Sequence, residues 1–447
     1  MQSTTELNAA RRKAVAAAGI GNFVEWFDFA LYAQFAVIIA AQFFPSSNPS
    51  AALLSTFAVF AVGFFARPIG GIIFGHFGDK LGRKASLSAA VLLMSAATIA
   101  IGLTPNYATV GVAAPILLVV WRVLQGLSAG GEYAGSSSFV IEYAPKGRRA
   151  LFASVNPVAT ALGTVGGAGV GLLVTGILGS AQVQDWGWRI PFLIAGPLGL
   201  VGLYLRSRVE ETPEFEAVRR AGIKSEHAPL VEAFKVAKGR MLLLVGWAIV
   251  NAVGFYLLSG YMIAYMTQHV GLSQSEALTA YIVALLVFSV ASPLAGLATD
   301  KYGARPVALL TAAALAVVVL PAFALVGVGT LLFAILGLSL YAVVVGGIST
   351  LTPLFMVDLF PTRIRYTASA VAYNVAYAAL GGTAPYVATY LVDRAGNGAA
   401  PGYYVLVIAV IGVLVALFGL RTVYRPGRRG VASPAVAAAD DGSKVSI

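Results

Sequence analysis

The sequence predicts an all-α membrane protein with twelve transmembrane helices in two pseudo-symmetric bundles of six, and three observations lead to this fold class. Hydrophobic residues make up 58% of the 447 residues and charged residues 11%, against roughly 45–50% and about 25% in soluble domains. The apolar runs are about twenty residues long and not strictly alternating, which is typical of membrane-spanning helices. Charged motifs also recur after about half the chain, which indicates a duplicated architecture.

The repeat comprises two motifs that occur in the same order in each half. The first has the spacing Gly-x3-Asp-x2-Gly and begins at Gly75 and again at Gly296, 221 residues later. The second is an acid followed by proline and arginine, and it begins at Glu142 and again at Asp358, 216 residues later. Two ordered pairs at nearly equal offsets predict two equivalent membrane halves.

Twelve apolar runs are predicted to cross the membrane, at residues 15–40, 52–74, 85–104, 113–137, 151–178, 190–205, 241–267, 276–298, 307–327, 330–355, 368–391 and 403–420. The sixth run is short, and Pro191 suits the first turn of its helix. The predicted organisation is a cytoplasmic lead 1–14, an N-terminal bundle 15–205, a cytoplasmic linker 206–240, a C-terminal bundle 241–420 and a disordered cytoplasmic tail 421–447.

Basic residues predict the orientation of these spans. All but four of the 30 Lys and Arg precede the first span, follow even-numbered spans or lie in the tail; the exceptions are Arg67, Arg122, Arg189 and Arg394. This bias places both termini in the cytoplasm of a cell whose inner (plasma) membrane the protein spans. The net charge of +11 therefore sets topology and does not indicate a nucleic-acid partner. Cysteine is absent, so neither disulfides nor thiol chemistry are expected.

The first span carries two acids on one helical face. Glu25, Asp28 and Tyr32 are spaced i, i+3 and i+7. A charged side chain at the middle of the membrane costs about 2.5–3.5 kcal/mol on insertion scales, so this face is expected to point away from lipid. Two interpretations remain open: a salt bridge that packs the bundle, or a proton or substrate site.

Basic partners for these acids are predicted from depth along each helix, at ~1.5 Å per residue. Asp28 and Arg122 lie at similar distances from the predicted cytoplasmic ends of spans 1 and 4. Arg67 and Glu132 both lie closer to that side. The sequence therefore permits two charged layers, Asp28 with Arg122 near the midplane and Arg67 with Glu132 below it.

The second half contains no clear acid or base within its predicted spans, so neutral hydrogen bonding is expected there. Its candidate substrate residues are Tyr256 and Asn374, although most tyrosines in such spans serve packing. In span 5, Asn156 precedes a series of glycines that allow close helix packing. The full set of candidate substrate-binding residues is Arg122, Tyr32, Trp26, Arg67, Gln125, Asn156, Tyr256 and Asn374.

The repeated turns are predicted to act as gating latches, with a plain topology-setting loop as the alternative. A helix N-terminus carries partial positive charge and a C-terminus partial negative charge. An acid near the start of the next helix, or a base near a neighbouring helix end, therefore makes a contact that breaks when helices separate. The candidate gating residues are Asp79, Arg83, Lys84, Asp300, Arg305, Glu142, Arg149, Asp358 and Arg365.

Enzyme and metal functions find little support. The segment from Gly126 to Gly130 fits a Gly-x-Ser-x-Gly pattern, but a nucleophile elbow requires a strand-to-helix turn, whereas this segment lies inside an apolar run. The three histidines do not have the spacing of a metal site. We therefore expect neither catalysis, nor a metal, nor a cofactor other than the coupling proton.

The duplicated turn resembles the signature loop of the major facilitator superfamily. Further segments resemble its metabolite:proton symporters, namely Gly21-Asn-x2-Glu-Trp-Phe-Asp28, Arg67-Pro-x-Gly-Gly71, Gln125-Gly-x-Ser-x-Gly-Gly-Glu-Tyr133 and Trp186-Gly-Trp-Arg-Ile-Pro191. Within that family, Glu210-Glu-Thr-Pro, Phe360-Pro-Thr-x-Ile-Arg-Tyr366 and Tyr403-Tyr404 are most similar to the proline/betaine transporters. Arg122 stands where the 2-oxoglutarate permeases have arginine.

The resemblance implies a solute:proton symporter that works by alternating access between two bundles. Asp28 is the first candidate for proton coupling, followed by Glu25 and Glu132. The expected solute is a small zwitterion like proline or betaine, with 2-oxoglutarate or another dicarboxylate as the alternative. A channel or a non-transporting receptor on the same fold is the alternative from a different class. The expected partners are the solute, protons and the lipid bilayer, and the protein is expected to be monomeric.

Overall fold

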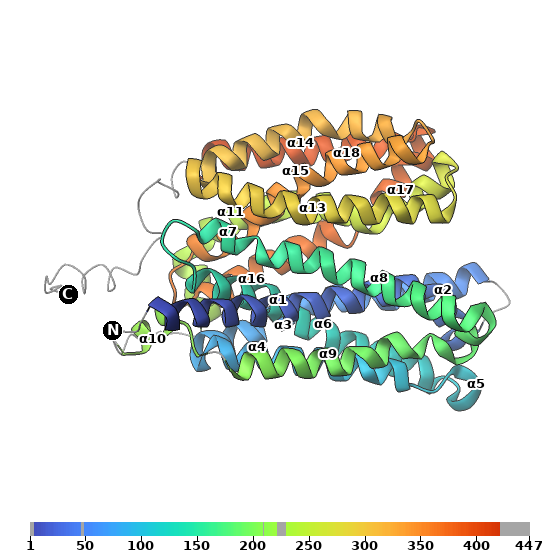
Figure 1. Ribbon diagram of the computed structural model, residues 1–447, viewed down its shortest axis with the longest axis horizontal. Coiled ribbons are helices and arrows are strands. Elements are labelled where there is room, and N and C mark those ends of the chain that lie inside the picture. The colour runs from blue at the N-terminus through green and yellow to red at the C-terminus, as the bar shows by residue number, and fades with distance from the viewer. Residues whose placement is uncertain (1–3, 46–48, 209, 221–228, 421–447) are drawn as a thin grey trace, which may run out of the picture. The chain divides into compact units, whose positions relative to one another are not determined.

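The structure is a computed structural model that describes residues 4–45, 49–208, 210–220 and 229–420. Every regular element in these residues is a helix, which confirms the predicted all-α class. The predicted tail 421–447 and part of the predicted linker lie outside the described residues. Figure 1 shows the long helices that dominate the chain.

Contacts between residues divide the chain into two units. The first is formed by the described residues of Met1–Ser136 and Ala159–Glu210, and the second by those of Ser137–Val158 and Glu211–Ile447. The segment Ser137–Val158, which runs from the end of the fourth predicted span into the fifth, thus groups with the second unit.

The helices of the first half of the chain follow the predicted spans, with short helices between them. In chain order they are α1 (Thr4–Gln34), α2 (Ala36–Phe43), α3 (Pro49–Leu81), α4 (Arg83–Leu103), α5 (Tyr107–Val110), α6 (Ala113–Glu142), α7 (Arg149–Ala153), α8 (Val155–Gln182), the π-helical turn η1 (Val183–Gly187) and α9 (Arg189–Ser207). Within the first unit, α4 packs along α9, α1 along α9 and α3 along α4.

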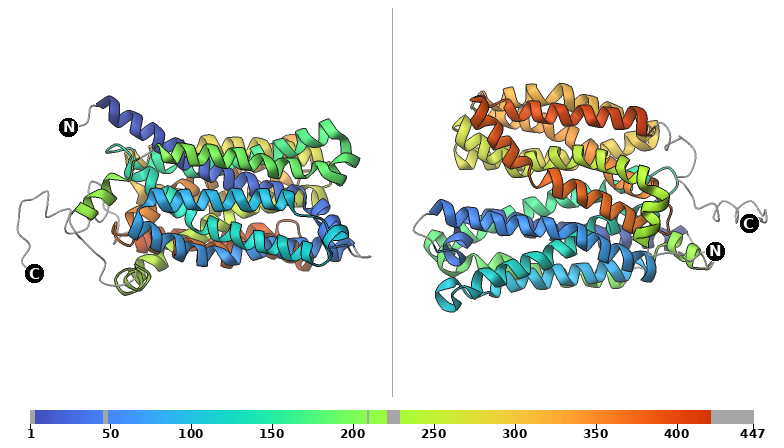
Figure 2. Two further views of the ribbon diagram at one scale, coloured as in Figure 1. Left: turned by 90° about the horizontal axis from the view of Figure 1, so that it is seen from below. Right: turned by 180° about the vertical axis from the view of Figure 1, so that it is seen from behind.

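The second half of the chain begins after α9 and is also made of helices and π-helical turns. In chain order its elements are α10 (Pro213–Arg220), α11 (Pro229–Tyr256), η2 (Leu257–Tyr261), α12 (Met262–Tyr265), η3 (Met266–Val270), α13 (Gln274–Tyr302), α14 (Ala304–Val326), α15 (Leu331–Asp358), α16 (Arg365–Ala376), η4 (Tyr377–Gly381), α17 (Ala384–Ala395), α18 (Ala400–Leu414) and η5 (Val415–Gly419). Within this unit α15 packs on α13 and α14, and α11 on α16. The red ribbon of α18 lies beside the orange α14 in Figure 2, and these helices are in contact.

Eleven stretches of the described chain are helices long and apolar enough to cross a membrane. The predicted eleventh span, 368–391, is not among them because the structure breaks it into α16, η4 and α17. Gly382 and Thr383 separate η4 from α17, and Pro385 lies in the first turn of α17, where its missing N–H is tolerated. The helical hydrogen bonding is therefore interrupted inside an apolar run that the sequence predicts as one continuous span.

The repeated turn folds alike in both halves. Its last glycine, Gly82 or Gly303, has a φ of 110° or 93° and directly precedes α4 or α14. A positive φ is readily adopted only by glycine. This requirement explains why the second glycine of the Gly-x3-Asp-x2-Gly motif occurs in both copies.

Candidate functional site

The charged side chains predicted to lie within the spans of the first unit are all buried. Their exposed fractions are 3% or less, for Glu25, Asp28, Arg67, Arg122 and Glu132. A buried charge is tolerated when it is paired and hydrogen-bonded. The partners of these groups therefore define the candidate site.

Asp28 on α1 and Arg122 on α6 form the layer predicted from depth. Arg122 Nη1 lies 3.7 Å from Asp28 Oδ2. Gln125, one helical turn along α6, donates from Nε2 to the same Asp28 oxygen at 2.7 Å and to Thr98 Oγ1 on α4 at 2.8 Å. The prediction that Asp28 and Arg122 share a level is confirmed, and Gln125 joins them.

Several polar atoms of this layer make no hydrogen bond to any described residue. They are Arg122 Nε, Arg122 Nη2, Asp28 Oδ1 and Gln125 Oε1. Buried polar groups in proteins are nearly always hydrogen-bonded. The layer therefore offers two donors on one edge of a guanidinium, and two acceptors, to a bound molecule.

Aromatic rings hold the Arg122 guanidinium. Its Cζ lies 3.5 Å from the centroid of the Tyr32 ring and 5.5 Å from that of Phe60. The two rings are stacked with centroids 5.5 Å apart, and the Tyr32 hydroxyl donates to the Thr56 carbonyl at 3.1 Å. Cation–π attraction at this desolvated position fixes the guanidinium plane. Trp26, the other predicted aromatic, is buried and its ring lies 5.7 Å from that of Phe29.

The predicted pairing of Arg67 with Glu132 is wrong. Arg67 on α3 forms an ion pair with Glu25 on α1, and its guanidinium lies 4.8 Å from the ring of Phe29 and 5.2 Å from that of Phe64. Depth along the helices places all three charges near one level, but only helix packing decides which pair meets.

Glu132 instead binds Arg206, a residue that the sequence interpretation did not select. Arg206 lies at the end of α9 and was counted with the cytoplasmic bases, yet only 2% of it is exposed. Its guanidinium reaches both Glu132 carboxylate oxygens and the carbonyls of Ala17 and Leu87. The available signal was a buried acid on α6 that needed a base.

The second copy of the repeated turn makes the contact expected of a latch. Asp300 at the end of α13 accepts hydrogen bonds from the backbone N–H groups of Ala150 and Leu151, both at 2.9 Å. These residues open α7. A Cβ added at Gly296 would come within 2.7 Å of the Ala150 carbonyl oxygen, which explains why the first position of the motif is glycine. Asp79, its counterpart in the first copy, is half-buried.

Two ion pairs of the second unit surround this contact. Arg149 Nη2 lies 2.8 Å from Asp358 Oδ1, and Arg365 is paired with Glu142. All four residues belong to the second repeated motif. The two copies of that motif therefore bind each other, each arginine to the acid of the other copy.

The bases of the repeated turn bind helix ends. Lys84 Nζ donates to the Ser207 carbonyl at 3.0 Å. Arg305 donates to the carbonyls of Ala416 and Leu417 at 3.3 and 3.2 Å. Arg83, the neighbour of Lys84, is fully buried. The expectation that a base of the turn reaches a neighbouring helix end is confirmed for both copies.

Neutral polar groups gather in the second unit around Asn251 on α11. Its Nδ2 donates to the Tyr377 hydroxyl at 2.8 Å, and its Oδ1 accepts from Ser349 at 2.6 Å. The ring of the predicted Tyr256 lies 5.8 Å from that of Tyr377. Tyr256 thus packs against Tyr377, the member of this polar group that begins η4.

The two predicted asparagines lie elsewhere. Asn374 donates to the Ala370 carbonyl of its own helix at 2.8 Å. Asn156 donates to Ser137 Oγ at 2.8 Å, in the part of the second unit that contains α7. Both side chains are buried.

The family model described as "Major Facilitator Superfamily" matches residues 18–384 and 248–440. The proline/betaine transporter of Escherichia coli K12 is 38% identical over 425 residues, which cover 93% of this chain and 84% of that protein. The ectoine/proline transporter ProP of Corynebacterium glutamicum is 34% identical over 428 residues, which cover 93% and 85%.

The fold is also that of solved transporters. The proton:xylose symporter XylE bound to 6-bromo-6-deoxy-D-glucose superposes with a TM-score of 0.79 at 19% identity, covering 96% of this chain and 99% of that one. The relatives and the fold are those of transporters and not of enzymes. The chain is a multi-pass membrane protein and belongs to the major facilitator superfamily.

Proposed function

We propose that this transporter is a proton-coupled symporter that imports a small zwitterionic solute by alternating access. The observation that carries the proposal is the layer of Asp28, Arg122 and Gln125, where a buried guanidinium edge and two acceptor oxygens make no hydrogen bond to any described residue. A buried arginine fork binds a carboxylate at two points.

The layer suits both charges of a zwitterion. The Arg122 edge formed by Nε and Nη2 would bind the carboxylate. Asp28 Oδ1 would face the cationic nitrogen, and the aromatic ring of Trp26 would attract such a cation further. Relatives named for transport of proline, betaine and ectoine support this substrate class.

A dicarboxylate is the alternative, and the structure disfavours it through Arg67. A second carboxylate needs a second base, and Arg67 is the candidate. Arg67 forms an ion pair with Glu25, so a dicarboxylate would have to displace that acid. Asp28 would in addition repel the second negative charge.

Proton coupling requires a buried acid that gains and loses a proton during transport. Asp28 is the first candidate, because one of its oxygens makes no hydrogen bond to a described residue while the other faces Arg122. Glu25 follows for the same reason at its Oε2, and Glu132 is third. The coupling ion would then be the proton, without a further cofactor.

The repeated motifs are proposed as the gate on the cytoplasmic side. The gating residues are Asp79, Arg83, Lys84, Asp300, Arg305, Glu142, Arg149, Asp358 and Arg365. Hydrogen bonds from charged side chains to helix ends are individually weak, so such contacts can break and reform in each cycle. The proposed setting is a monomer in the inner membrane, with both termini in the cytoplasm.

Uptake into proteoliposomes tests the proposal. With an imposed pH gradient, the protein is expected to accumulate labelled proline or glycine betaine above equilibrium. Collapse of the gradient with a protonophore should reduce the internal concentration to the external one. Flux that merely equilibrates would identify a channel, and binding without flux a receptor. Accumulation of 2-oxoglutarate, with none of either zwitterion, would overturn the substrate class.

A further inference from the structure

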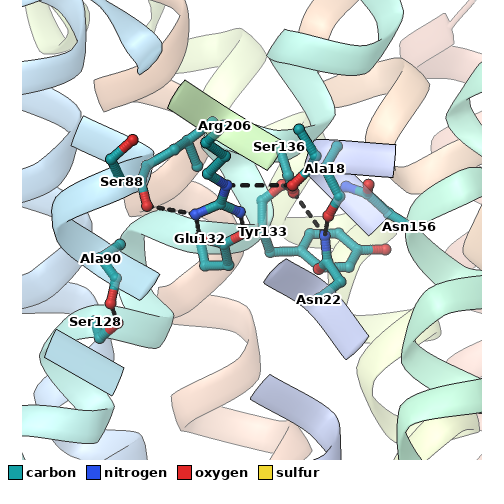
Figure 3. Close-up of polar contacts among 12 residues, drawn as sticks. Ala18, Asn22, Ser88, Ala90, Ser128, Glu132, Tyr133, Ser136, Asn156 and Arg206 are labelled. Carbon is teal, nitrogen blue, oxygen red and sulfur yellow. Dashed lines mark hydrogen bonds and ion pairs between the residues drawn. The ribbon is translucent and has the colours of Figure 1, made fainter. Parts of the chain in front are cut away.

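The buried Arg206 guanidinium connects four helices of the first unit. It belongs to α9, binds both carboxylate oxygens of Glu132 on α6, and donates to the carbonyls of Ala17 on α1 and Leu87 on α4. Figure 3 shows Arg206 and Glu132 facing each other, with Asn22 and Ser136 beside them. We call Arg206 and Glu132, with these two carbonyls, the α9 clamp.

The sequence around the clamp provides the space that it needs. A Cβ added at Gly21 would collide with Arg206 Nη2 and Glu132 Oε1, so α1 can pass the ion pair only with glycine there. The next residue, Asn22, donates from Nδ2 to Ser136 Oγ on α6 at 2.8 Å. The Gly-Asn pair of α1 is thereby explained by two contacts with α6.

The clamp lies two helical turns from the proposed solute layer. Asp28 follows Gly21 by seven residues on α1, and Gln125 precedes Glu132 by seven on α6. At ~1.5 Å per residue, both intervals correspond to about 10 Å. The two helices therefore keep one antiparallel register from the clamp to the hydrogen bond between Asp28 and Gln125.

Glu132 differs from Asp28 and Glu25, the other two candidates for proton coupling, in how fully it is bound. Both of its oxygens accept from Arg206. Glu25 Oε2 and Asp28 Oδ1, by contrast, make no hydrogen bond to a described residue. A carboxylate held in a two-point fork by an arginine has a defined position, and the charge-assisted hydrogen bonds favour its ionised form.

We infer that Arg206 is a positioning residue: the α9 clamp sets the register of α1 against α6, and Glu132 serves it as a permanent anion that carries no coupling proton. The coupling proton then belongs to Asp28 or Glu25. This inference rests on the proposed proton-coupled transport.

The test separates coupling from folding with the variants Glu132→Gln, Arg206→Gln and the double variant. Removal of one partner of a buried ion pair leaves an uncompensated charge, whereas removal of both does not, so each single variant is expected to lose about tenfold or more of its uptake. The double variant is expected to recover most of that loss. Its ratio of internal to external proline under a pH gradient should equal that of the wild type.

Exchange of preloaded proline, which needs no net proton movement, is measured in parallel. A double variant that exchanges proline but no longer accumulates it would show that Glu132 carries the proton, and would overturn the inference. A double variant no more active than either single variant would overturn the clamp as a unit. Wild-type protein that exchanges proline without accumulating it refutes the proposed function itself, which is a different outcome.

Arg206→Lys tests the positioning role separately, and it remains informative if the double variant does not insert. Lysine keeps the charge opposite Glu132 but lacks the fork that also reaches Ala17 and Leu87. The expected result is a KM for proline raised several-fold, with an unchanged accumulation ratio. An unchanged KM would show that Arg206 does not position the solute layer. Lys235→Arg, at a position with an exposed side chain on α11, is the control for expression.

Discussion

Lys84 and Arg305 occupy the same position in the two copies of the repeated turn, 221 residues apart, and each binds the end of the last long helix of its own unit. Lys84 donates to the Ser207 carbonyl at the end of α9, and Arg305 to two carbonyls of η5, which continues α18. Arg189 at the start of α9 donates in turn to the carbonyls of Gly102 and Thr104 at the end of α4, both at 2.7 Å. Helices α4 and α9 are thus tied at both ends.

Lys84→Ala and Arg305→Ala should each lower thermal stability, because a cation at a helix C-terminus contributes about 0.3–1 kcal/mol. The measurement is the melting temperature of the detergent-solubilised protein. Lys235→Ala is the control, because Lys235 is exposed and lies inside α11, not at the C-terminus of a helix. Equal losses in all three variants would contradict the assigned role.

Arg122→Lys should weaken proline and glycine betaine binding by about 10- to 100-fold, since lysine retains the charge but not the two-point contact, worth about 1.5–3 kcal/mol. Arg122→Gln should abolish binding. Titrated thermal-shift measurements give the affinities, with 2-oxoglutarate, citrate and shikimate as further ligands. Arg189→Lys, which changes an arginine bound to a helix end, should leave the affinity unchanged. If a dicarboxylate stabilises the wild type and neither zwitterion does, the substrate is a dicarboxylate, and Arg122 binds one of its carboxylates.

Asp28→Asn should abolish accumulation and spare exchange of preloaded solute. One proton entering across ~100 mV releases about 2.3 kcal/mol, which supports about a 50-fold gradient of a zwitterion at about 1.4 kcal/mol per tenfold. The ratio of internal to external label should therefore fall from that range to one. Asp185→Asn, at an exposed position of η1, is the control. Full accumulation in Asp28→Asn and in Glu25→Gln alike would refute the assignment of coupling to these acids.

Asp300→Ala should release α7, because it removes the acceptor of two backbone hydrogen bonds. A cysteine introduced at Ser154, a buried position next to α7, should then react several-fold faster with a thiol reagent. The chain contains no cysteine of its own, so the label reports this position alone.

Glu276→Gln is the matched control for this labelling, because it removes an acid at the opposite end of α13. It should not change the rate. Unchanged labelling in Asp300→Ala would leave the second copy of the turn as a loop that only sets topology.

Repetition in the sequence was sufficient to find the contacts at Asp300 and Arg305, because a spacing that occurs twice must satisfy the same backbone geometry twice. Depth along a helix likewise predicted that Asp28 and Arg122 lie at one level. Both predictions use only the position of a residue along its own helix. They therefore succeed where that position alone decides which groups lie at the same level.

Partner choice among charges at one level could not be predicted in this way. Whether Arg67 meets Glu25 or Glu132 depends on how α3 rotates against α1 and α6, which no spacing within one helix encodes. Arg206 was missed for a related reason. A basic side chain at the end of an apolar run can either face water or pair with a buried acid. Only the packing of α9 against α1 and α4 decides which of the two Arg206 does.

The interruption at Gly382 affects how the number of membrane crossings is counted. Helical stretches long and apolar enough to cross a membrane number eleven in the described chain, and an odd number of crossings would put the two ends of the polypeptide on opposite faces of the membrane. If α16, η4 and α17 together make one crossing, the number is even, and both ends emerge on the same face. A criterion that counts only continuous apolar helices would therefore place every loop after α15 on the opposite face of the membrane. Yet the stretch from α16 to α17 differs from a continuous span by a single turn of backbone.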